Sequence, residues 1–138
     1  MVPTVLQLKP AVEISTSWEG KSIHIVGLNV DPDCGTLQQG LEQLQIIRRE
    51  RASTMDKRLA DYGVTGALQA AMNMAGTGMI TRTHFARYLV ECGLAASIRD
   101  VFDRYLVPGK PGYVNTEWAT IADAVHWIRT AGGVAVIA

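Results

Sequence analysis

The chain has 138 residues, 48% of them hydrophobic, which is typical of one soluble globular domain with a substantial core. Thirteen basic and thirteen acidic residues give a net charge of +0, so no overall charge favours nucleic acid or an anionic membrane as a partner. No apolar run approaches the roughly 20 residues that span a bilayer, and the first residues do not resemble a signal peptide. Two isolated cysteines, Cys34 and Cys92, fit reduced thiols better than a disulfide framework. We therefore expect a cytoplasmic protein without membrane contact.

The first part of the chain predicts strands. Val5–Leu8 and Val12–Thr16 read as strands, and Ser22–Leu28 continues after a Glu-Gly turn signal. Because side chains alternate between the two faces of a strand, Glu13 and His24 can both point to the inside of a barrel.

The middle of the chain predicts helices. A long helix is expected from Thr36, its N-cap, to about Tyr62, with one apolar stripe spaced by three and four residues. Further helices are expected at 67–74, from Thr81 or Thr83 to about residue 92, at 98–105, and at 121–130 after a capping Thr120. The apolar run at 134–138 predicts a fully buried parallel strand. The pattern as a whole is that of an α/β protein with most of its helix in the middle.

Glu13 and His24 are polar side chains within apolar strands. A buried charge is costly unless it is paired or bound to a metal, and one metal site would satisfy both residues. Glu13 could instead be hydrogen-bonded to the backbone or paired with an arginine, and a histidine on an apolar strand is often a satisfied core residue. The residues by themselves leave these alternatives open.

Several short strings stand in order along the chain: AVEISTSWEG, IHIVGLNVD, TRTHFAR, LVECG, VFDRYL, GKPGYV and GGVAVIA. Together they resemble the central segment of the PHP (polymerase and histidinol phosphatase) family of metal-dependent phosphoesterases. Within it, the chain is most similar to the bacterial branch that contains nucleotide phosphatases and a 5′-to-3′ exoribonuclease. The resemblance runs from about residue 5 to the last residue, and co-linear strings are more specific than any single one.

The resemblance implies a fold and an activity. The fold would be a distorted (β/α)7 barrel, with residues 1–35 and 109–138 as part of the barrel and residues 36–108 as a mostly helical insertion, or lid. The activity would be hydrolysis of phosphate esters of a nucleotide or of an RNA 5′ end, with two or three divalent ions; Mn²⁺, Fe²⁺ and Zn²⁺ all suit imidazole and carboxylate ligands. Glu13 would bridge two ions and His24 would ligate one.

Other family ligands are not in this sequence. Family members open with His-x-His and Asp-His elements and close with His-Pro and Asp-x-His elements, and none of these is present. Because the His-Pro element usually follows a Gly-Gly-x-Ala-Val-x-Ala strand, we expect a central fragment of a longer enzyme that stops one residue short of a ligand. A catalytic ion usually needs at least three protein ligands, so this segment alone is expected to be inactive. Its open strand edges are expected to make it self-associate.

Five residues are predicted to contact the substrate: Arg82, Thr83, His84, Lys110 and Tyr113. The first three lie at a predicted helix N-terminus, where backbone N–H groups and an arginine attract phosphate, although His84 could serve only in packing or capping. Lys110 lies in a glycine-flanked loop with Tyr113 available to stack on a base, although most exposed loop lysines have no such role.

The long helix also carries a basic segment that consists of Arg48, Arg49, Arg51, Lys57 and Arg58. Such segments are usually solvated faces, although some of these residues could meet RNA phosphates if the lid handles an RNA 5′ end. The competing function is a non-catalytic helical binding module, in which residues 36–108 recognise a partner and the strand residues only pack. That hypothesis predicts that phosphatase activity of the full-length protein survives mutation of Glu13 and His24.

Overall fold

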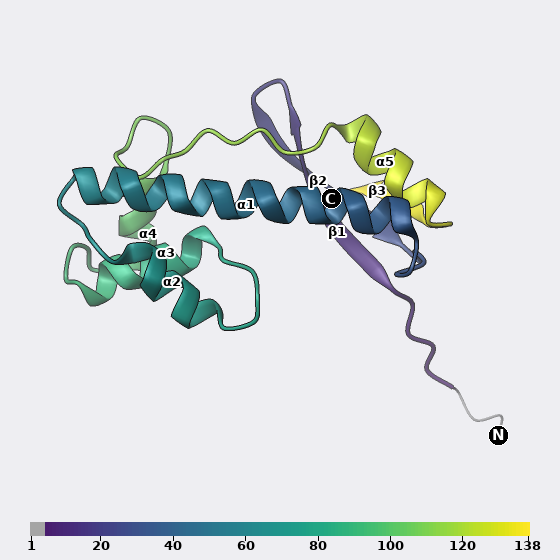
Figure 1. Cartoon of the computed structure of the whole chain (residues 1–138), viewed down its shortest axis with the longest axis horizontal. Helices are drawn as coiled ribbons and strands as arrows, with labels where there is room; N and C mark the ends of the chain where they lie inside the picture. The colour runs from purple at the N-terminus through teal and green to yellow at the C-terminus, as the bar shows by residue number, and fades with distance from the viewer. Residues whose placement is uncertain (1–4) are drawn as a thin grey trace. The chain divides into compact units, whose positions relative to one another are not determined.

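The computed structural model describes residues 5–138 as a mixed α/β chain with one three-stranded sheet (Figure 1). The described residues divide into two compact units. Unit 1 consists of the residues up to Gln45 together with Glu117–Ala138, and unit 2 consists of Ile46–Thr116. Helix α1 (Gly35–Asp61) contributes its first part to unit 1 and its second part to unit 2. The α/β class is thus confirmed, and the assignment of barrel and lid to parts of the chain stays a prediction.

Unit 1 is built on an antiparallel sheet in the order β1 (Ala11–Trp18), β2 (Lys21–Leu28) and β3 (Val134–Ile137). β1 and β2 form a hairpin whose two turn residues, Glu19 and Gly20, have φ angles of 47° and 73°. Positive φ at both positions gives the turn a twist that matches the twist of paired strands. The two hairpin strands agree with the prediction.

The predicted strand at Val5–Leu8 is wrong, because these residues have no strand structure. An extended segment becomes a strand only when a neighbour pairs with its backbone N–H and C=O groups. The sheet order places β2 beside β1 and gives residues 5–8 no such neighbour within the described chain.

The prediction of a fully buried parallel strand at 134–138 is also wrong. β3 pairs antiparallel with β2, and Val134, Val136 and Ile137 are exposed. A continuous apolar run is typical of a strand with neighbours on both sides and on both faces. In the described chain β3 is an edge strand, so the same run leaves apolar side chains in contact with solvent.

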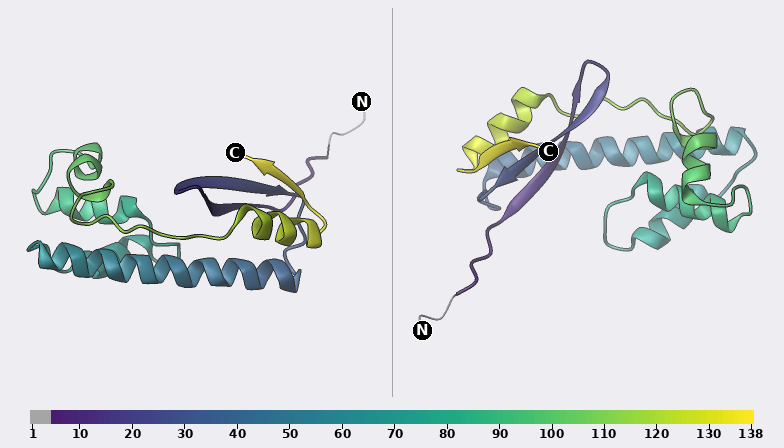
Figure 2. Two further views of the ribbon diagram at one scale, coloured as in Figure 1. Left: turned by 90° about the horizontal axis from the view of Figure 1, so that it is seen from above. Right: turned by 180° about the vertical axis from the view of Figure 1, so that it is seen from behind.

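Helix α5 (Ile121–Thr130) covers one face of this sheet (Figure 2). It begins as predicted, because the hydroxyl oxygen of Thr120 accepts a hydrogen bond from the Asp123 N–H at 3.0 Å. Its buried residue Ile128 lies against Gly27 of β2, where an added Cβ would be 2.7 Å from Ile128 Cγ1. Glycine at this position allows the helix to approach the sheet closely.

Unit 2 is helical. It contains the second part of α1, α2 (Ala67–Ala75), α3 (Arg82–Glu91), α4 (Ile98–Val101) and the π-helical turn η1 (Phe102–Leu106). These elements share one core, which consists of Ala52, Met55, Leu59, Val64, Ala67, Ala71, Phe85, Ala86, Leu89, Val101, Tyr105 and Leu106. Among the described residues, no helix has both the length and the apolar character needed to cross a membrane.

The predicted helix at 98–105 is correct in extent, but its second half is not α-helical. The Val107 N–H donates to the Phe102 carbonyl, five residues back, at 3.1 Å, which is the pattern of a π-helix. The Tyr105 carbonyl instead accepts a hydrogen bond from the Gly112 N–H at 2.7 Å. The Gly112 N–H of the following loop therefore bonds to a carbonyl group of the last helical turn.

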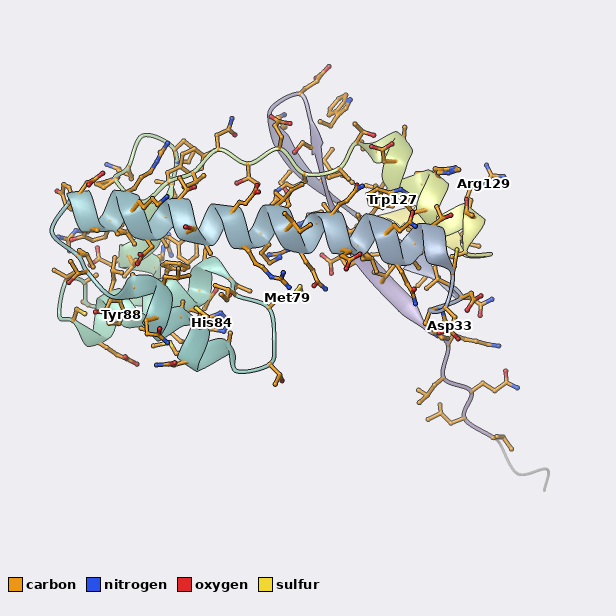
Figure 3. The ribbon with its side chains drawn as sticks, viewed as in Figure 1. Asp33, Met79, His84, Tyr88, Trp127 and Arg129 are labelled. Carbon is orange, nitrogen blue, oxygen red and sulfur yellow. The ribbon has the colours of Figure 1, made fainter. Side chains whose placement is uncertain are left out.

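Replacing Gly40 of α1 by alanine is expected to destabilise the protein by on the order of 1–2 kcal/mol. An added Cβ would lie 2.4 Å from the ring of Trp127 on α5 (Figure 3). Overpacking costs about 1–3 kcal/mol, and so close an approach to a ring places this site in the upper part of that range. The roughly 1 kcal/mol by which alanine favours a helix over glycine offsets part of the cost. Urea unfolding followed by circular dichroism measures the change. Gly35→Ala is the control, because a Cβ there meets nothing within 4 Å; equal stability of both variants would contradict the close Gly40–Trp127 contact.

Candidate functional site

The β1–β2 hairpin brings the two predicted metal ligands together. Ser15 lies opposite His24 and Glu13 lies opposite Val26, so Glu13 and His24 are diagonal neighbours on one face of the hairpin. The Glu13 Oε1 atom is 2.5 Å from the His24 Nδ1 atom. A carboxylate and an imidazole from adjacent strands therefore meet at one point of unit 1.

This face of the hairpin is open to solvent. The Glu13 side chain is 60% exposed and the His24 side chain 47% exposed. The opposite face holds Ile14, Thr16 and Ile25, which are at most 1% exposed. The expectation that Glu13 is a buried charge is therefore wrong for this chain: its apolar sequence neighbours point to the buried face, while Glu13 and His24 point to the other.

Because the pair is exposed, a ligand can reach both donor groups from solvent. A carboxylate and an imidazole nitrogen suit a borderline divalent ion such as Zn²⁺, Fe²⁺ or Mn²⁺. Among residues 5–138, however, no group of three or more His, Cys, Asp or Glu side chains is placed to hold a metal ion. Two donors are fewer than the three protein ligands of a usual catalytic site.

Exposed apolar side chains lie on the same face of the sheet as the pair. The strand register places Leu28, Val134 and Val136 on the same face of the sheet as Glu13. Their exposed fractions are 46%, 64% and 44%. A contiguous apolar surface of this kind is typical of a face that contacts another structure.

The predicted substrate residues Arg82, Thr83 and His84 begin α3 in unit 2. Figure 3 labels His84 among them. The Thr81 N–H donates to His84 Nδ1 at 3.0 Å, and the His84 N–H donates to the Thr81 carbonyl at 3.1 Å. His84 thus occupies the position of the glutamate in a capping box. Because Nδ1 accepts a hydrogen bond, the neutral ring carries its proton on Nε2, which remains a donor for an anion.

Lys110 and Tyr113 lie in the loop after η1, and backbone hydrogen bonds hold this loop in shape. The Lys110 N–H donates to the Val107 carbonyl and the Tyr113 N–H donates to the Lys110 carbonyl, both at 3.1 Å. The Tyr113 carbonyl accepts a hydrogen bond from the Arg58 guanidinium. Within the described part of the chain, no hydrogen bond or ion pair joins Lys110 or Tyr113 to the residues at the start of α3.

In unit 2, Arg82 of α3 lies within electrostatic range of Arg51 of the basic segment on α1, which the sequence did not predict. Burial, and to a lesser degree the positive charges of Arg48 and Arg82, lower the pKa of Arg51 to about 10. Burial also lowers the pKa of Arg48. Arg82 is more than 30 residues away from Arg51 along the chain, so only the tertiary fold reveals that the two interact.

The chain is similar over nearly all of its length to bacterial phosphoesterases, which confirms the resemblance seen in the sequence strings. One relative is the 5′-3′ exoribonuclease Rnm of Escherichia coli, 48% identical over 133 residues, which are 96% of this chain and 45% of that protein. Another is the 3′,5′-nucleoside bisphosphate phosphatase of Chromobacterium violaceum, 48% identical over 128 residues, which are 92% of this chain and 45% of that protein. The chain thus spans less than half the length of these relatives. No family model matches the chain.

Two solved structures share the fold. An amidohydrolase from Chromobacterium violaceum, solved with bound sulfate and no metal, is 48% identical with a TM-score of 0.85. A protein from Bifidobacterium adolescentis described as a metal-dependent phosphoesterase has a TM-score of 0.82 at 22% identity. Each comparison covers 92% of this chain and 45% of the other. The chain therefore resembles in fold a part of each of these proteins.

Replacing His84 by alanine is expected to destabilise the protein by about 0.5–2 kcal/mol, the usual cost of removing a helix cap. The variant leaves the Thr81 N–H without its present acceptor. His84→Gln is the matched variant, because glutamine at this position of a capping box can accept the same hydrogen bond and should restore most of the stability. Urea unfolding measures both. Equal stability of the alanine variant and the unmodified chain would show that the capping contact contributes nothing.

Proposed function

We propose that this chain provides part of the metal centre and part of the substrate site of a metal-dependent phosphoesterase that hydrolyses phosphate esters of nucleotides or short RNA. The observation that carries the proposal is the 48% identity to an exoribonuclease and to a nucleoside bisphosphate phosphatase, over at least 92% of the chain. The adjacent carboxylate and imidazole of Glu13 and His24 supply chemistry that such an activity needs.

In this proposal Glu13 and His24 hold divalent metal ions, Mn²⁺, Fe²⁺ or Zn²⁺, of which the complete centre contains two or three. When bound, such ions polarise a phosphoryl oxygen and supply a hydroxide near neutral pH. Glu13 has two carboxylate oxygens and so can bridge two ions, while His24 offers one ring nitrogen. Both side chains are exposed on one face of the hairpin, which supports this assignment.

Residues of unit 2 would orient the substrate. Arg82 and Thr83 lie in the first turn of α3, where backbone N–H groups and the helix dipole attract a phosphate. His84 can donate from Nε2 while Nδ1 keeps the capping contact. Lys110 would add a positive charge and Tyr113 a stacking surface for a base.

We also propose that residues 1–35 and 109–138 belong to a distorted (β/α)7 barrel and residues 36–108 to its helical lid. The exposed apolar side chains beside Glu13, and the free edge of β3 in the described sheet, support the view that further strands cover this face. Without such a cover the same surfaces favour self-association. Cys34 and Cys92 are free thiols, which supports a place in the reducing cytoplasm.

A chimera tests the catalytic proposal. Replacing the corresponding segment of the Chromobacterium violaceum phosphatase by this chain is expected to give an enzyme that releases phosphate from a nucleoside 3′,5′-bisphosphate. Glu13→Gln and His24→Gln in the chimera should lower both phosphate release and bound metal at least 10–100-fold, because even residues beyond the direct ligands have effects of that size. Glu19→Gln, in the turn of the same hairpin, is the matched control. An active chimera that tolerates both site variants would favour the helical binding module.

The 138-residue chain alone is expected to bind Mn²⁺ or Zn²⁺ weakly and to release no phosphate, because Glu13 and His24 are fewer ligands than a catalytic ion requires. Metal content after dialysis, measured by mass spectrometry on the chain and on the chimera, checks this. Tight metal binding of equal stoichiometry in both would show that the site needs no further ligands.

A further inference from the structure

Two consecutive β-turns form the loop after η1 in unit 2. They cover residues 107–110 and 110–113, and each is closed by a hydrogen bond of 3.1 Å from the N–H of its fourth residue to the carbonyl of its first. Each turn has proline at its second position, where the fixed φ of proline suits a turn. Gly109, third in the first turn, has a φ of 83°, as a type II turn requires. The sequence of this loop therefore favours one rigid shape.

The turns fix the backbone of the two loop residues that are predicted to contact the substrate. Lys110 belongs to both turns, so its N–H and its carbonyl are both bonded, while the residue itself is exposed. The carbonyl of Tyr113, the last residue of the second turn, accepts a hydrogen bond from the Arg58 guanidinium of α1. The first and fourth Cα atoms of a β-turn lie within about 7 Å of each other. A cationic and an aromatic side chain thus start from fixed positions that are close together.

Helix α1 contacts the second turn through two successive residues. Gly112 is buried, and an added Cβ there would lie 3.0 Å from Leu59 Cδ2. The neighbour of Leu59, Arg58, bonds to Tyr113 across 55 residues of the chain. Arg58 is exposed, so its contact with the loop adds nothing to the buried core. Its effect is local: it fixes the end of the second turn, where Tyr113 lies.

We propose that Arg58 is a positioning residue for recognition of a nucleobase. Through the Tyr113 carbonyl it holds the second turn so that the Tyr113 ring is oriented to stack on the base of a nucleotide whose phosphate Lys110 binds. This inference rests on the proposed function, which assigns Lys110 and Tyr113 to the substrate. It adds a residue that does not touch the substrate and a reason why the site distinguishes a nucleotide from a simple sugar phosphate.

The two substrate contacts differ in how much they depend on the backbone. Lys110 carries a compact charge on a flexible stem, so its attraction to a phosphate tolerates a shift of the loop. Tyr113 has a rigid ring whose stacking depends on its orientation, and the residue is half-buried. Loss of the Arg58 contact is therefore expected to weaken recognition of the base much more than recognition of the phosphate.

Binding of AMP and of ribose 5-phosphate to the full 138-residue chain tests the proposal, with chemical-shift changes in NMR spectra as the readout. The two ligands share the sugar phosphate and differ by the base. The unmodified chain should bind AMP roughly ten-fold more tightly, the size expected for one stacked base. Arg58→Ala should weaken AMP binding roughly three- to ten-fold and ribose 5-phosphate binding less than about two-fold, because only stacking depends on the turn.

Three further variants separate positioning from a general effect of charge or stability. Arg49→Ala removes an exposed arginine from the same helix and should bind both ligands like the unmodified chain. Arg58→Lys keeps a donor for the Tyr113 carbonyl and should restore most of the AMP affinity. In a Tyr113→Ala background, which lacks the stacking ring, Arg58→Ala should cause no further loss of AMP affinity.

The proposal is overturned if the unmodified chain does not prefer AMP, or if Arg58→Ala behaves like Arg49→Ala. It is also overturned if Arg58→Ala weakens both ligands equally, or if its effect persists in the Tyr113→Ala background. Failure of the proposed function is a separate result, since it appears as an inactive chimera. An active chimera together with an unchanged AMP preference in Arg58→Ala would reject only the positioning role.

Discussion

The register between β1 and β2 determines which side chains of unit 1 meet the helices and which remain available to a ligand. With Ile14 opposite Ile25, the apolar side chains face α5, and Glu13 and His24 share the other face. A shift of one residue would exchange the two faces and bury a carboxylate in place of an isoleucine. The two-residue turn at Glu19 and Gly20 fixes the register at one end of the hairpin. The Thr16 hydroxyl supports it on the buried side by donating to the Ile23 carbonyl at 2.6 Å.

Charged side chains interact in both units, at different degrees of exposure. In unit 1 a carboxylate and an imidazole meet at an exposed position, where their interaction is weak and a ligand can bind either group. In unit 2 burial lowers the pKa of Arg51 to about 10, and the charges of Arg48 and Arg82 add to this lowering.

The sequence allowed most helices and the hairpin to be predicted, because their signals are local. Thr120 with Asp123 marks the start of α5, and the spacing of apolar residues marks α1. The errors concern long-range structure. The run at β3 has the same composition whether its neighbours are present or not, so its antiparallel pairing and its exposure could not be foreseen. Likewise, strand alternation places Glu13 and His24 on a common face, but only the packing of α5 decides that this face is the open one.

Because Glu13 and His24 are exposed, their charges do not need a metal ion for stability, although a metal ion can still bind them. A solvated acid–base pair is stable by itself and does not require an ion. Were the apolar face around Leu28 and Val136 covered, as in the proposed barrel, water would leave the pair and its charges would become costly unless a cation or further ligands compensated them. Burial of the surrounding apolar surface would offset the free-energy cost of desolvating the pair. Covering the sheet and binding the metal would then stabilise each other, and neither step would be strongly favourable in the described chain alone.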